Sequence, residues 1–188
     1  MSMDQKTILI IIHVFGAVIG AGGAYMSDLL FLKAARDEVI SKTEIGFLKL
    51  GGKIGWFGLF ILVLSGTGLF LLDTEKYLAS PKFLVKMTIV AVLIINGIIF
   101  HATHIPRMAR HAGQHFPSSD EFMRKRPLLL LSGCVSIISW SAALILGMLK
   151  SIPYSYETTM LLYAAAVGLA FLGAFTLKNK LVPGRKRQ

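Results

Sequence analysis

The sequence predicts an all-α integral membrane protein with five transmembrane helices. Its 188 residues are 54% hydrophobic, and the mean hydropathy is +0.66. Five apolar runs each reach about 20 residues, the length that a helix needs to cross roughly 30 Å of hydrocarbon. A soluble domain of this length does not carry such runs. We therefore expect one compact bundle in a lipid bilayer, formed by a single transmembrane domain over residues 1–188.

Local signals mark where several of these helices begin and end. Ser41-Lys42-Thr43-Glu44 has the spacing of a capping box and predicts the start of the second helix. Ser80-Pro81 combines an N-cap hydroxyl with a proline at the first helical position, and it predicts the start of the third. That helix is expected to end before Pro106. The expected helices are about 7–33, 42–72, 81–105, 127–149 and 157–177. A short loop is expected at 73–79, a polar cytoplasmic connector at 107–126 and a basic tail at 178–188. The connector repeats the capping-box spacing at 118–121.

The distribution of positive charge predicts the orientation of the chain. Fifteen of its 20 Lys and Arg residues fall on the side that the first connector, the third connector and the C-terminus share. By the positive-inside rule, we expect the N-terminus outside and the C-terminus in the cytoplasm. The membrane expected under the leading hypothesis below is the plasma (inner) membrane of a prokaryote. The same loop charge explains the net charge of +10 without a nucleic-acid partner.

The first apolar segment carries a histidine followed by a stripe of small residues. At about 100° per residue, a helix places the five positions within roughly 80° of one another. Such a groove suits either a close-packed second helix or a flat ligand that hangs from the histidine, and the sequence leaves both interpretations open. The stripe consists of His13, Gly16, Gly20, Gly23 and Ser27.

The third helix presents a polar face. His13 lies about six residues into the first helix and Lys86 about five residues past Pro81, so the order of the spans places both about 9 Å deep in the outer half. Lys86 either snorkels to the outer interface or pairs with an anionic group of a bound ligand. Four positions fall within roughly 100° of arc and are expected to face the interior: Lys86, Asn96, Gly97 and His104.

A second group of histidines follows toward the cytoplasmic end. If the helix continues past Pro106, five side chains share a stripe roughly 80° wide. Histidine and methionine suit copper, haem iron or zinc, whereas the simpler interpretation is a set of histidines at a wet interface. The five residues are His101, His104, Met108, His111 and His115.

The remaining helices are expected to serve mainly in packing. A stripe of small residues, Ser132, Ser136, Ser139, Ala143 and Gly147, predicts close approach by the fourth helix. The two tryptophans, Trp56 and Trp140, fit packing or anchoring roles, or aromatic positions beside a cofactor. The fifth helix has no ionisable residue between Glu157 and Lys178 and is expected to brace the bundle.

Over roughly residues 8–108 the sequence resembles the superfamily of haem-containing membrane protoporphyrinogen oxidases and copper-resistance protein D membrane domains. Three segments carry the resemblance: His13-Val14-Phe15-Gly16-Ala17 through Gly22-Gly23, Ser65-Gly66-Thr67-Gly68-Leu69, and Phe83-Leu84-Val85-Lys86-Met87. The resemblance implies a bundle of four core helices with one added. It also implies that His13 is an axial ligand of a b-type haem and that Lys86 is the cation near it. The third-helix histidine of the family falls near Asn96 or Gly97 here, one turn before His101.

The leading hypothesis is therefore a b-type haem-binding membrane protein with an electron-transfer or oxidoreductase role, acting with a quinone or a porphyrin-like small molecule. His13 would ligate the iron and Lys86 would meet a propionate. Gly16, Gly20 and Gly23 would make space for the ring, with Asn96 facing the same cofactor. The first alternative is transport of, or resistance to, copper or another metal ion through His101, His104, Met108, His111 and His115. The second is a cofactor-free membrane scaffold, and a homodimer is compatible with each of the three.

Overall fold

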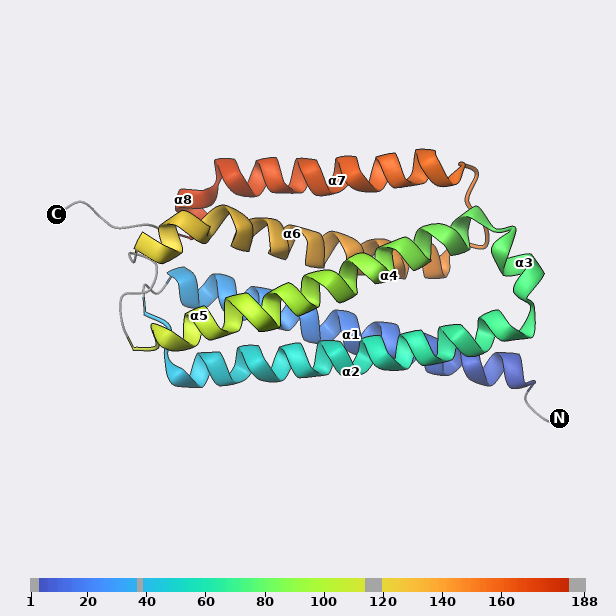
Figure 1. Ribbon diagram of the computed structural model, residues 1–188, viewed down its shortest axis with the longest axis horizontal. Helices are drawn as coiled ribbons and strands as arrows, with labels where there is room; N and C mark the ends of the chain where they lie inside the picture. The colour runs from blue at the N-terminus through green and yellow to red at the C-terminus, as the bar shows by residue number, and fades with distance from the viewer. Residues whose placement is uncertain (1–3, 37–38, 114–119, 183–188) are drawn as a thin grey trace.

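The computed structural model describes residues 4–36, 39–113 and 120–182, and all regular secondary structure in these ranges is helical. The helices run nearly side by side along the long axis, with the start of α1 and α8 at opposite ends of the molecule (Figure 1). They are α1 (Gln5–Arg36), α2 (Lys42–Leu72), α3 (Thr74–Leu78), α4 (Pro81–Ile99), the π-helix η1 (Phe100–His104), α5 (Ile105–Arg110), α6 (Asp120–Met148), α7 (Tyr156–Thr176) and α8 (Lys178–Leu181).

Five helical segments in the described ranges are long and apolar enough to cross a membrane, which confirms the number expected from the apolar runs. They are Gln5–Ala34, Lys42–Leu72, Pro81–Arg110, Asp120–Met148 and Tyr156–Thr176. The chain is therefore a multi-pass membrane protein by the length and composition of its helices.

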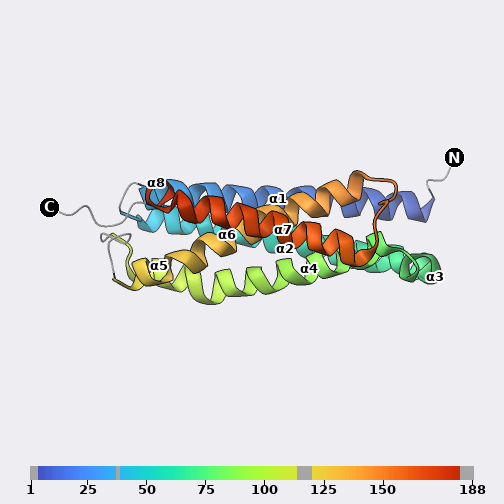
Figure 2. The same cartoon turned by 90° about the horizontal axis from the view of Figure 1, so that it is seen from above.

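The last long helix lies on the outside of the bundle. None of the residues of α7 is buried, and Figure 2 shows it running along α6. Two tyrosine hydroxyls nevertheless tie α7 to its neighbours, since Tyr156 hydrogen-bonds Thr88 of α4 at 3.0 Å and Tyr163 hydrogen-bonds Ser139 of α6 at 2.8 Å. This placement fits the bracing role expected for the fifth helix.

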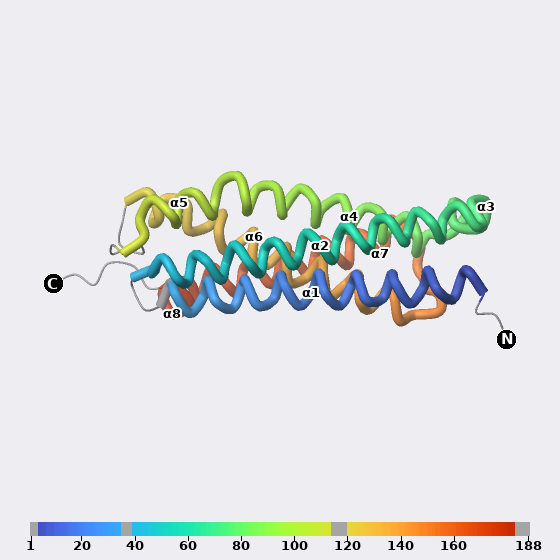
Figure 3. Tube along the Cα trace, turned by 90° about the horizontal axis from the view of Figure 1, so that it is seen from below, coloured from blue at the N-terminus to red at the C-terminus, as the bar shows by residue number. Residues whose placement is uncertain are grey.

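Two apolar clusters form the core, one toward each end of the bundle. The cluster nearer the chain's C-terminus centres on Phe31, Leu48, Met108 and Phe122. The other joins α2, α4 and α6 through buried side chains that include Leu59, Ile89 and Trp140. The first and second helices run alongside each other over most of their length (Figure 3).

The start of α2 follows the sequence prediction. The backbone N–H of Glu44 donates to Ser41 Oγ at 3.1 Å, and the Ser41 N–H donates to Glu44 Oε2 at 2.8 Å, so both halves of the capping box form. At the start of α4, Pro81 occupies the first turn as predicted, but the Ser80 side chain makes no capping hydrogen bond.

The prediction that the third span ends before Pro106 is wrong. The helix continues to Arg110 because the π-helix Phe100–His104 precedes the proline, with the Ile105 N–H donating to the Phe100 carbonyl. A proline ring clashes with the carbonyl four residues earlier and offers no N–H to it, and the wider π-turn relieves that clash. Much of the expected polar connector at 107–126 is therefore helical.

Other predicted bounds also shift. The expected loop at 73–79 contains the short helix α3, and α6 begins at Asp120 rather than 127, so that Pro127 lies inside it. Acidic residues in the first turn of α6, Asp120 and Glu121, favour this earlier start because they complement the helix dipole. The predicted capping residue Ser118 and the last six residues of the basic tail lie outside the described ranges, and α8 occupies the start of that tail.

Candidate functional site

The glycine stripe of α1 packs against the backbone of α2. A Cβ added at Gly16 would lie 2.8 Å from the Leu62 nitrogen, and one added at Gly23 would lie 2.6 Å from the Gly55 nitrogen. On the facing helix, a Cβ added at Gly58 would collide with the backbone of Gly20. Of the two interpretations that the stripe allowed, the structure shows the close-packed second helix, in the manner of small-residue contacts between membrane helices.

The other side of Gly20 is filled by an aromatic ring from α6. A Cβ added there would lie 2.9 Å from Cζ3 and 3.0 Å from Cζ2 of Trp140, whose side chain is 4% exposed. Between α2 and this indole, the stripe leaves no void in which a porphyrin could lie. The space predicted for a haem ring along Gly16, Gly20 and Gly23 therefore does not fit the group, and haem binding stays a prediction.

His13 points into a notch on α2. Its Nδ1 lies 3.0 Å from Ser65 Oγ, and a Cβ added at Gly66 would lie 3.1 Å from its Cε1. The Ser65 hydroxyl donates to the Ile61 carbonyl at 2.6 Å, so the His13 Nδ1–H is the donor to Ser65. Lys86 of α4 is near enough to act on His13 electrostatically, as the order of the spans suggested.

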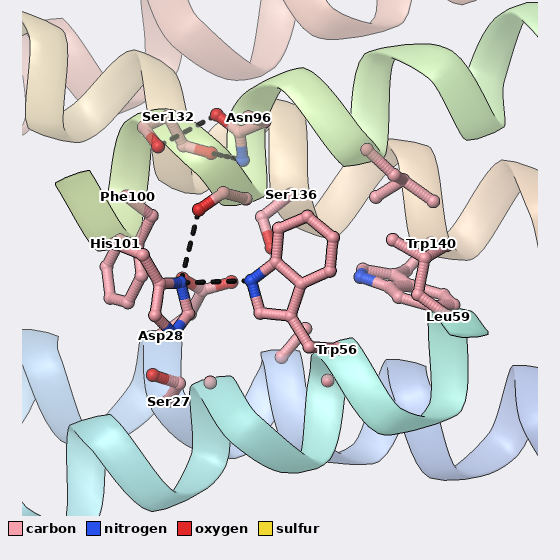
Figure 4. A pocket seen from close by; sticks show the side chains of 15 residues that line it. Ser27, Asp28, Trp56, Leu59, Asn96, Phe100, His101, Ser132, Ser136 and Trp140 are labelled. Atoms are coloured by element: carbon pink, nitrogen blue, oxygen red, sulfur yellow. Dashed lines mark hydrogen bonds between the residues drawn. The ribbon is translucent and has the colours of Figure 1, made fainter.

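A mainly apolar cavity that several polar groups border lies elsewhere, between α1, α2, α4 and α6 (Figure 4). Its volume is about 70 Å³, which is several times the roughly 10–15 Å³ that one water molecule needs. Six side chains give the cavity its chemical character: Asp28, Trp56, Asn96, His101, Ser136 and Trp140.

Asp28 is the acidic group of this cavity. Ser136 of α6 borders the same cavity and interacts with the carboxyl group, and the carboxyl oxygen Oδ2 is buried without a hydrogen-bond partner in the described structure. Within residues 4–36, 39–113 and 120–182, no Lys, Arg or His forms an ion pair with it. A carboxyl group inside a membrane bundle is costly to ionise without a counter-ion, so this position requires a proton or a cation.

Asn96 and Ser132 join α4 to α6 at the edge of the cavity. The Asn96 amide donates to the Ser132 carbonyl at 3.1 Å, and the Ser132 hydroxyl donates to Asn96 Oδ1 at 2.8 Å. The predicted cofactor-binding residue Asn96 thus uses its amide to hold two helices together, and the predicted packing role of Ser132 includes a hydrogen bond.

His101 is held between α2 and its own helix. The Trp56 indole N–H donates to Nδ1 at 3.2 Å, and the Gly97 carbonyl lies 3.1 Å from the same nitrogen. An indole N–H can only donate, so Nδ1 accepts and carries no proton while that bond exists. Gly52 gives the ring its place, since a Cβ added there would lie 2.7 Å from His101 Nε2.

The structure does not gather the remaining predicted metal ligands. His104 is 2% exposed and its Nε2 has no hydrogen-bond partner in the described structure, Met108 belongs to the apolar core, and His111 pairs with Glu121 at 3.2 Å. The π-turn changes the 100° spacing on which the predicted stripe depended. Among the described residues there is no group of three or more His, Cys, Asp or Glu placed to hold a metal ion, and His115 lies outside them.

The sequence prediction missed Asp28, whereas for Trp56 and Trp140 it left open packing, anchoring and a position beside a cofactor, and the structure places both at the cavity. One signal for Asp28 was present, because it is the only acidic residue within the first apolar run. Comparison with protein-family models, with curated proteins and with solved structures finds no match to this chain.

Proposed function

We propose that the protein is a transport protein of the plasma membrane that binds a proton or a small cation at Asp28. The observation that supports this proposal is a buried carboxyl oxygen without a partner, Asp28 Oδ2, at a cavity between four membrane-spanning helices. Ionisable residues within membrane spans typically belong to ion pathways or proton relays.

The surroundings of the carboxyl group suit alternate occupation by a proton and a cation. The Ser136 hydroxyl favours the ionised form of the carboxyl group, and the cavity lining in the described structure contains no Lys or Arg that would neutralise it permanently. The proposal includes the membrane orientation that the loop charges predict. With the N-terminus outside, the C-terminal third of α1 and hence Asp28 lie in the cytoplasmic half of the membrane.

The proposal is tested by measuring proton movement with the full chain reconstituted in lipid vesicles that enclose a pH-sensitive dye. We expect an imposed pH gradient to decay faster with the wild-type protein than in protein-free vesicles. In Asp28→Asn the decay should return to the protein-free rate. The asparagine amide has nearly the same shape as the carboxyl group, but it does not take up and release a proton as a carboxyl group does.

The matched control is Glu75→Gln, which makes the same chemical change on the exposed helix α3, away from the cavity. Circular dichroism establishes that each variant is folded. A folded Asp28→Asn variant with the wild-type decay rate would contradict the proposal, as would equal losses in both variants.

A further inference from the structure

The walls of the cavity differ from those of a site for a bare metal ion. Two tryptophans, Trp56 from α2 and Trp140 from α6, border the same space as Asp28, together with Phe100 from the π-helix (Figure 4). Inorganic cations prefer several oxygen ligands, whereas aromatic rings with one carboxylate are the combination that recognises alkylammonium groups.

The aromatic walls are held in place by specific contacts. Trp56 donates its indole N–H to His101, and its ring lies over Gly97, where an added Cβ would be 3.1 Å from Cζ2. Phe100 contacts the same histidine edge to face, with ring centroids 5.7 Å apart. His101 is thus a positioning residue for two of the rings.

The polar groups of the cavity leave one strong acceptor for a ligand. The Asn96 side chain is hydrogen-bonded to Ser132 through both its amide nitrogen and its oxygen, and His101 Nδ1 is already the acceptor for Trp56. Asp28 borders the cavity, and its Oδ2, which protein atoms cover, has no such partner in the described structure. A ligand that enters is therefore recognised chiefly by one negative charge and by aromatic faces.

We propose that the cavity binds a small organic ammonium ion, with its charge at Asp28 and its alkyl groups against Trp56 and Trp140. The cavity volume is about 70 Å³. In the same measure one water molecule needs roughly 10–15 Å³. The cavity therefore has room for a ligand of about five heavy atoms. The inference rests on the proposed function, since it names the cargo of the same carboxyl group.

The test is binding of tetramethylammonium to the purified full chain in detergent, followed by tryptophan fluorescence. The chain has two tryptophans and both border the cavity, so the signal reports on this site directly. We expect a saturable change with tetramethylammonium and none with tert-butyl alcohol, which has a similar shape and no charge. Sodium chloride at the same ionic strength should also have no effect.

Two variants separate the contributions of charge and aromatic face. Asp28→Asn should weaken binding by roughly 30-fold or more, because the buried charge loses its partner, and Trp56→Phe by about two- to fivefold. Glu75→Gln on α3 should bind as the wild type does. If Asp28→Asn does not fold, the comparison of the charged and uncharged probes on the wild-type protein still decides the question.

Equal binding of the two probes, or no binding of tetramethylammonium by the wild-type protein, would overturn the inference. Either result would leave the proposed function standing if the vesicle assay still shows proton movement that depends on Asp28. Loss of that proton movement as well would overturn both.

Discussion

The contact between α1 and α2 makes a quantitative prediction about a single methyl group. In Gly23→Ala the new Cβ would start 2.6 Å from the Gly55 nitrogen and 2.8 Å from the Gly51 carbonyl oxygen. These are backbone atoms and cannot rotate away. Since carbon contacts are comfortable at about 3.5 Å or more, the helices would have to separate locally by roughly 1 Å, a gap that forfeits a quarter to a half of each dispersion contact.

Overpacking of this kind costs about 1–3 kcal/mol, against which replacing a helical glycine by alanine gains about 0.5–1 kcal/mol. We expect Gly23→Ala to lower the free energy of unfolding by about 1–2 kcal/mol. The control is Gly22→Ala, one residue earlier on the same helix, where an added Cβ meets nothing within 4 Å. That variant should be neutral or slightly more stable. Thermal unfolding in one detergent compares the two, and equal shifts would refute the packing described for Gly23.

Two further predictions concern a helix start and the predicted haem ligand. Ser41→Ala removes the hydroxyl that accepts the Glu44 N–H in the first turn of α2, and it should lower the free energy of unfolding by about 1 kcal/mol. Thr43→Ala, in the same turn, should lower it by less. Thermal unfolding that shows the reverse order would contradict the capping assignment. α2 and Trp140 fill the space along the glycine stripe of α1. We therefore expect the visible spectrum of the purified protein to show no Soret band that depends on His13. A Soret band that is lost in His13→Ala would restore the haem hypothesis.

The spans were predictable because the length of an apolar run decides whether it can cross a bilayer, whatever its neighbours are. The second helix, Lys42–Leu72, matches its predicted bounds because the capping box acts within four residues. Pro106 shows the limit of such local rules. A proline commonly ends a helix, but here a π-helix upstream accommodates it, and a single sequence carries no clear signal for that turn.

The glycine stripe shows why sequence alone left two interpretations of the first helix. A stripe without side chains is equally suited to a helix and to a ligand, and the choice depends on whether a second helix presents glycines at matching heights. Gly51, Gly55 and Gly58 of α2 do so, at positions that face Gly23 and Gly20. This matching is a property of two segments roughly 35 residues apart, and it appears only when their relative register is known.

The position of the cavity follows from the same contact. Because α1 and α2 pack backbone to backbone, they form one surface on which Asp28 of α1 and Trp56 of α2 border a shared space. His101 reaches that space from the π-helix of the third span, where Trp56 holds it. Separating α1 from α2 should therefore alter the cavity as well as stability. Gly23→Ala should change the tryptophan fluorescence of the folded protein, to which Trp56 and Trp140 both contribute, whereas Gly22→Ala should not. An unchanged tryptophan fluorescence in a folded Gly23→Ala protein would show that the helix contact and the cavity are independent.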